Sequence, residues 1–181
     1  MTEMIGRDGV GLMLGESGGR FTGAFRGMTE GAFHFKMARD RWSIAETVEH
    51  VTVAEVGSGK LIRGRLVREA SPPELVAETA LGEARIDARL LTRDRVFPAP
   101  EFVLPTGRWR TPDEMIAVFE ESRRATIDFI ATTELDLTKF AAPHPALGPL
   151  NGLQWAYFLV RHCLRHIDQI SEIKAAAGYP T

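Results

Sequence analysis

Two histidines four residues apart, His162 and His166, are the residues of this chain whose spacing most directly suggests chemistry. They lie in a segment with helical periodicity, where residues i and i+4 stack on one face. A buried polar group without a partner costs about 1–3 kcal/mol, and a divalent cation would satisfy both imidazoles. Taken alone, however, this spacing is more often that of hydrogen-bonded core or surface histidines.

A metal site of this kind needs a third protein ligand, since catalytic sites usually combine three ligands with an open position. His50 is the natural candidate because it lies at the edge of the apolar face of another predicted helix. Glu46, one turn earlier, is a candidate to orient the His50 ring. Gln169, which follows His166, could hydrogen-bond a bound ligand. The predicted metal ligands are therefore His50, His162 and His166, and no catalytic residue is assigned.

The other histidines and the single cysteine have less informative surroundings. His34 and His144 fall in predicted loops and are interpreted as turn residues rather than ligands. Cys163 lies about 100° around the helix from His162, so we interpret it as a small core residue. One cysteine cannot form an internal disulfide or a thiolate zinc cluster, so histidine and carboxylate must hold any metal.

Four helical segments must position these residues. Glycines interrupt the first, and each costs about 1 kcal/mol of helix propensity. The second opens with a Ser43–Glu46 capping box, and the third opens with Thr111 as N-cap before Pro112. The last ends before Gly178, a residue type common just after helix ends. The predicted segments cover residues 10–29, 43–65, 111–133 and 150–177.

The predicted connections are unequal in length. A short helix is plausible over residues 73–93, and the proline-rich stretch 97–107 should be an extended loop. A connection this long often covers a functional site, so Val96–Gly107 is expected to form one wall of the predicted metal site. A loop rich in proline and glycine is expected over 142–149, and no strands are expected. The chain is therefore predicted to be one all-α domain, residues 1–181, built as a four-helix bundle.

A charged stripe on the last predicted helix should face water, with the two histidines on a shoulder turned towards neighbouring helices. The placement follows from the helical rotation of about 100° per residue. The stripe consists of Gln154, Arg161, Arg165, Asp168 and Glu172.

Composition excludes several classes of protein. The 181 residues carry 22 basic and 24 acidic side chains, with no basic excess to neutralise nucleic-acid phosphates. No run of about eighteen apolar residues is present to span a membrane. The first twenty residues, 1–20, lack the pattern of a signal peptide. We therefore expect a cytoplasmic protein that binds a small molecule and has neither nucleic acid nor membrane as a partner.

Three motifs together resemble the DinB-like superfamily. They are Trp42–His50, Gly148–Trp155 and the stretch from His162 to Lys174. The resemblance implies an antiparallel four-helix bundle with a long crossed-over connection between its second and third helices. It also implies that His50, His162 and His166 bind Ni, Zn or Fe. Members of this superfamily resemble metal-dependent hydrolases, or transferases and isomerases that use a low-molecular-weight thiol such as bacillithiol, mycothiol or glutathione.

Three functional hypotheses follow. The first is a metalloenzyme in which a divalent ion activates water or a thiol, acting as a hydrolase or a thiol S-transferase. The second is a non-catalytic helical bundle that binds metal or dimerises. A homodimer is expected under the first hypothesis as well. The third, a non-haem iron oxygenase, is disfavoured because such enzymes use two histidines and one carboxylate.

Overall fold

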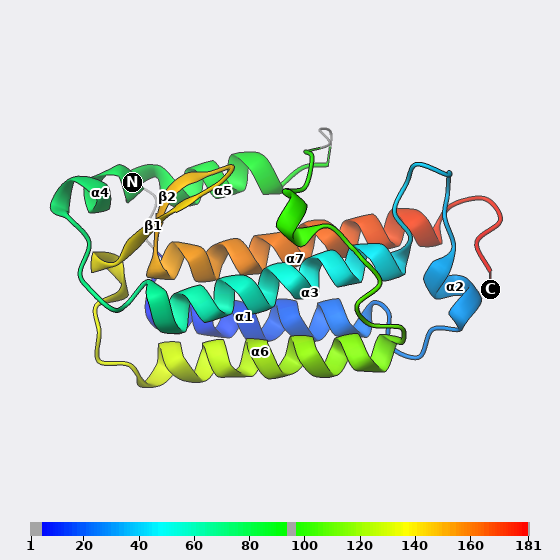
Figure 1. The fold of residues 1–181 in the computed structure, drawn as a ribbon, viewed down its shortest axis with the longest axis horizontal. Coiled ribbons are helices and arrows are strands. Elements are labelled where there is room, and N and C mark those ends of the chain that lie inside the picture. The colour runs from blue at the N-terminus through cyan, green and yellow to red at the C-terminus, as the bar shows by residue number, and fades with distance from the viewer. Residues whose placement is uncertain (1–4, 94–96, 181) are drawn as a thin grey trace.

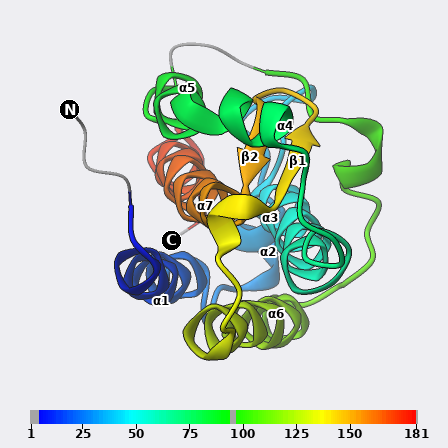
Figure 2. The same ribbon diagram turned by 90° about the vertical axis from the view of Figure 1, so that its left-hand side faces the viewer.

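A computed structural model describes residues 5–93 and 97–180, and four long helices dominate it (Figure 1). Both α1 and α3 pack against α6 and α7, so α1 and α3 occupy opposite corners of the bundle (Figure 2). α1 and α7 run in one direction, and α3 and α6 run in the other (Figure 1). The predicted four-helix bundle is confirmed. Its helices are α1 (Arg7–Gly23), α3 (Ile44–Lys60), α6 (Pro112–Thr132) and α7 (Gly152–Lys174).

Capping boxes set the starts of three of these helices. The predicted box of Ser43 and Glu46 starts α3, and Thr111 with Glu114 starts α6. A third box, in which the Asn151 side chain accepts from the Gln154 N–H, starts α7. Such boxes satisfy backbone donors that the first turn leaves free. α3 continues through a π-helical turn, η1 (Leu61–Arg65), as far as the sequence predicted.

The glycine-rich first helix forms, but it is shorter than predicted. α1 ends at Gly23, and a separate short helix, α2 (Glu30–His34), follows. His34 therefore ends a helix rather than lying in a loop. A Cβ atom built on Gly18 would lie 3.4 Å from Cγ of Arg123, so this glycine lets α1 approach α6 closely.

The long connection between α3 and α6 has two parts. The first part, α4 (Pro73–Ala77), η2 (Glu78–Leu81) and α5 (Gly82–Leu90), matches the predicted short helix and lies over α7 (Figure 2). The second part, residues 97–107, contains a 3-10 turn, η3 (Glu101–Val103). It carries the chain back, so that α6 begins at the same end of the bundle as α3 (Figure 1). The crossed-over connection is thus present.

A β-hairpin replaces the loop predicted before α7. After a 3-10 turn, η4 (Leu137–Lys139), β1 (Ala141–His144) pairs antiparallel with β2 (Gly148–Asn151). Pro143 lies opposite Pro149, a pairing that requires no N–H from either residue. The strands were missed because prolines within such short segments hide any alternation.

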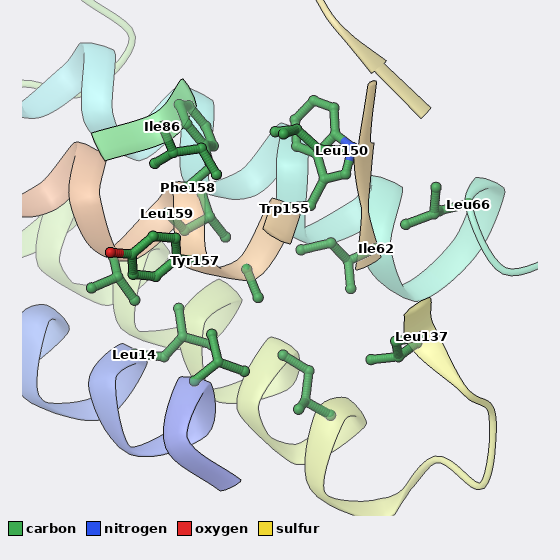
Figure 3. Close-up of a cluster of buried hydrophobic side chains, with 14 of the residues drawn as sticks. Leu14, Ile62, Leu66, Ile86, Leu137, Leu150, Trp155, Tyr157, Phe158 and Leu159 are labelled. Atoms are coloured by element: carbon green, nitrogen blue, oxygen red, sulfur yellow. The ribbon is translucent and has the colours of Figure 1, made fainter. Parts of the chain in front are cut away.

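The apolar core has two parts separated by a buried ion pair. One part lies beneath α5 and the hairpin, and includes Ile62, Leu150 and Trp155 (Figure 3). The other is rich in phenylalanine. Between them, Arg123 on α6 pairs with Glu55 on α3, Nη2 to Oε2, at 2.7 Å. Within the described residues, no helix is both long and apolar enough to cross a membrane.

Two residues predicted to face water, Gln154 and Arg165, are instead buried. Gln154 donates from Nε2 to the Thr79 carbonyl at 2.9 Å, and Arg165 donates to the Thr92 carbonyl. The connection containing η2 and α5 covers this side of α7. Asp168, farther along, is exposed as predicted. The periodicity of α7 alone could not reveal a cover supplied by another segment.

Candidate metal centre

The three predicted ligands meet where α3 and α7 pack together. Nε2 of His50 lies 3.1 Å from Nε2 of His162, and Nε2 of His166 lies 3.2 Å from the same atom. One ring nitrogen from each of the three side chains falls within 4.8 Å of the others. Each residue is at most 7% exposed, so little of any of the three side chains reaches bulk solvent.

A backbone carbonyl defines the tautomer of His50. Nδ1 of His50 lies 3.0 Å from the carbonyl oxygen of Val103, in the η3 turn. A carbonyl can only accept, so Nδ1 carries the proton and Nε2 presents a lone pair. A carbonyl on the outer ring nitrogen is the usual support of a metal-binding histidine.

A side-chain amide does the same for His166. Nδ1 of His166 lies 2.9 Å from Oε1 of Gln169, which also accepts from Nη1 of Arg93 at 3.2 Å. Nε2 of Gln169 donates to Oγ1 of Thr47 at 3.2 Å, which fixes the amide orientation. His166 is therefore protonated on Nδ1, and its Nε2 lone pair faces His162. Gln169, expected to contact a bound ligand, instead orients a histidine.

The cluster is suited to a cation. Nε2 of His162 can donate one proton to only one of its two neighbours, which leaves another buried lone pair without a partner. Burial is the largest cause that lowers the pKa of all three histidines, and for His162 the neighbouring His166 and His50 lower it further. The rings are therefore neutral at pH 7, as metal ligands must be. The residues present fit a divalent metal ion.

Glu46, the candidate to orient His50, is engaged elsewhere. Its carboxylate accepts from the backbone N–H of Ser43 at 2.8 Å and from Nζ of Lys36 at 2.7 Å. The carbonyl of Val103 takes the predicted role instead. Because that carbonyl belongs to the long connection, only the tertiary fold brings it to His50.

Glu49 is a supporting residue that the sequence analysis missed. Its buried carboxylate accepts three backbone N–H bonds, from Thr106 at 2.8 Å, Gly107 at 2.9 Å and Arg108 at 3.2 Å. These bonds hold the connection against α3, three residues beyond Val103. Glu49 therefore helps to place the carbonyl that orients the neighbouring histidine. Gly107 gave a weak sequence signal for a tight turn at this point, and it adopts a φ of 75° there.

A cavity of about 690 Å³ adjoins the three histidines. Trp42 packs near His50, with ring centroids 5.1 Å apart, and Phe158 stacks against His162 at 5.2 Å. The expected wall, Val96–Gly107, is present in its described part, while Val96 lies outside the described residues. The residues of this wall that line the cavity are Phe97, Pro98, Ala99, Pro100, Phe102 and Val103.

His144 lies outside the cluster but lines the same cavity. It belongs to β1, and its ring centroid is 4.6 Å from that of Phe158. The N–H of Ala146 donates to Nδ1 at 3.1 Å, and burial, with the charge of Arg89, lowers the His144 pKa to about 4. The neutral ring therefore carries its proton on Nε2. The interpretation as a turn residue overlooked this contribution to the cavity.

Cys163 is buried, as predicted. Its Sγ lies 3.1 Å from Nη2 of Arg123. Burial raises the pKa of the thiol to about 12, so it stays protonated at neutral pH. A protonated buried thiol is a poor nucleophile and metal ligand.

The fold and the site together define a four-helix bundle with a buried three-histidine cluster beside a cavity. A family profile described as the DinB superfamily matches residues 13–170, a span that includes the cluster. The chain belongs to the DinB superfamily.

Two proteins from Bacillus subtilis are similar to this chain. The uncharacterized protein YuaE of strain 168 is 25% identical over 149 residues, covering 82% of this chain and 87% of YuaE. The structure of YfiT, described as a probable metal-dependent hydrolase with an unusual four-helix bundle topology, has a TM-score of 0.59 at 16% identity. That likeness covers 99% of this chain and 92% of YfiT, and it concerns the fold.

Proposed function

We propose that this protein is a metal-dependent hydrolase of small molecules, with His50, His162 and His166 holding one Ni, Zn or Fe ion. The observation that carries the proposal is the convergence of three ring nitrogens beside a cavity of about 690 Å³, a size typical of small-molecule sites. The description of YfiT as a probable metal-dependent hydrolase favours hydrolysis over other metal chemistry.

Each of the surrounding residues has a role in this proposal. A bound divalent ion supplies Lewis acidity, which lowers the pKa of water towards about 7 and polarises an electrophilic substrate. The carbonyl of Val103 and the amide of Gln169 keep His50 and His166 in the ligating tautomer. Nε2–H of His144 is available to donate to a substrate oxygen.

The proposal is tested by hydrolysis assays on metal-free protein and on protein loaded with Zn, Ni or Fe. The substrates are a panel of small esters, amides and lactones. We expect turnover only in loaded protein, and a loss of at least about 100-fold in His50→Ala. His34→Ala, which removes an exposed histidine outside the cluster, is the matched control and should retain activity. Equal turnover by metal-free protein or by His50→Ala contradicts the proposal.

The same assay separates the remaining alternatives. Turnover that requires an added low-molecular-weight thiol would assign thiol transfer, because a metal deprotonates a coordinated thiol. Stoichiometric metal with no turnover would favour the non-catalytic bundle. The homodimer and the cytoplasmic location remain predictions from the sequence.

A further inference from the structure

The charged residues that line the cavity are mostly cationic, although the chain as a whole carries a formal net charge of −2. Among the described residues that line the cavity, arginines outnumber acidic residues. The arginines are Arg41, Arg89, Arg93 and Arg165, and the acidic residue is Asp40. A concave surface of one charge sign concentrates ligands of the opposite sign.

The arginines differ in what they already bind. Arg93 is neutralised by Glu172, to which Nε and Nη2 donate at 2.7 and 2.8 Å. Arg165 donates to the carbonyl of Thr92. In contrast, Arg89 forms no ion pair within residues 5–93 and 97–180, although it is partly buried. A partly desolvated guanidinium without a carboxylate is a site for an external anion.

The aromatic ring of Phe97 holds Arg89 in place. Cζ of Arg89 lies 3.8 Å from the centroid of the Phe97 ring, and Cζ of Arg165 lies 5.4 Å from the same centroid. A guanidinium over a ring face still has its N–H groups in its own plane, where they can donate in pairs. The stacking thus orients Arg89 without using its hydrogen-bond donors.

The remaining surface of the cavity suits an apolar body. Besides Phe97, aromatic side chains of Trp42, Phe102, Trp155 and Phe158 line it. Three neutral histidines also leave the full charge of a divalent ion uncompensated, which adds to the attraction for a negative ligand. The cavity therefore combines an apolar wall with a cationic one.

We infer that the ligand of this cavity is an organic carboxylate whose anionic group binds Arg89 and whose apolar body packs against the aromatic wall. A carboxylate accepts two parallel N–H bonds from a guanidinium, an arrangement that a neutral amide cannot reproduce. The inference rests on the proposed function, because it assumes that the cavity is the substrate site. Arg89 is then a specificity-determining residue.

The test uses metal-free protein, prepared by dialysis against a chelator, so that a carboxylate cannot bind through the metal. Two probes of equal size, 3-phenylpropionate and 3-phenylpropanamide, are titrated calorimetrically into wild type, Arg89→Gln and Arg124→Gln. Arg124 is exposed on α6, on the opposite side of the bundle from α5 (Figure 2), so its replacement changes net charge equally. Far-ultraviolet circular dichroism verifies that all three proteins are folded.

We expect wild type and Arg124→Gln to bind the acid at least tenfold more tightly than the amide. In Arg89→Gln, the two affinities should agree within about threefold. Equal affinities in wild type, no measurable binding of either probe, or a preference that survives Arg89→Gln would overturn the inference. Metal content is measured separately on the same preparation before dialysis, so failure of the metal proposal remains distinguishable.

Discussion

Replacing Glu49 by glutamine tests whether the long connection supports the metal centre. The substitution preserves size and removes one acceptor atom and the charge. In the structure Oε1 accepts from the N–H groups of Thr106 and Arg108, and Oε2 accepts from that of Gly107. A glutamine amide must turn its own N–H₂ towards one of these donors, leaving at least one backbone N–H without an acceptor.

The magnitude follows from these bonds. One buried, unsatisfied N–H costs about 1–3 kcal/mol, and the other bonds weaken from charge-assisted to neutral. We expect the free energy of unfolding to fall by about 2–4 kcal/mol. The loss is limited because residues 97–107 can detach from α3 and expose the unpaired N–H to water. Detachment also removes the carbonyl of Val103 from His50, and loss of such a support typically reduces metal affinity about 10–100-fold.

Glu46→Gln is the matched control because it makes the same change one turn earlier on the same helix. Its side chain is 31% exposed, so we expect a loss of no more than about 1 kcal/mol and unchanged metal affinity. Urea denaturation measures stability, and competition with a chromophoric zinc chelator measures affinity. If Glu49→Gln binds zinc as tightly as Glu46→Gln does, the connection does not support the site.

Three further predictions concern other parts of the structure. Gln169→Leu removes the acceptor from Nδ1 of His166 and should weaken zinc binding about 10–100-fold in chelator competition, whereas an unchanged affinity would refute its orienting role. Arg123→Met leaves Glu55 buried without its partner and should cost about 3–5 kcal/mol in guanidinium denaturation; Arg123→Met/Glu55→Leu should recover most of it, and a double variant as unstable as the single one would refute this. Folding lowers the pKa of His144 from 6.5 to about 4, so the unfolded chain binds more protons between these values and stability falls as pH drops through this window. His144→Phe should reduce that slope by no more than about 1 kcal/mol per pH unit, given partial solvation; a slope equal to wild type in urea titrations from pH 6.5 to 4 would contradict it.

The fold was predictable where signals are local. Ser43 with Glu46, and Thr111 with Glu114, mark helix starts within four residues, and the apolar periodicity between such caps defines the bundle. The hairpin at 141–151 was not predictable, because its prolines leave no alternating pattern. The burial of Arg165 likewise depends on a segment distant in sequence.

The ligand cluster itself was predictable in part. The spacing of His162 and His166 suggested a pair, the position of His50 at the edge of an apolar helix face suggested the third ligand, and the resemblance to a known family strengthened the assignment of all three. The supports from Val103 and Glu49 had no local signal, since they arise only when the long connection folds over α3. The helix faces that meet can thus be predicted from apolar periodicity. The hydrogen-bond partners that a loop supplies to those faces become visible only in the tertiary structure.

The most direct test of the account is the metal content of the protein purified without an affinity tag. Elemental analysis, followed by titration of the chelator-treated protein with zinc, gives the identity and stoichiometry of the bound ion. We predict one divalent ion per chain in wild type and in His34→Ala, and none in His162→Ala. Wild-type protein without stoichiometric metal and without zinc uptake, or His162→Ala that binds zinc as wild type does, would contradict the assignment.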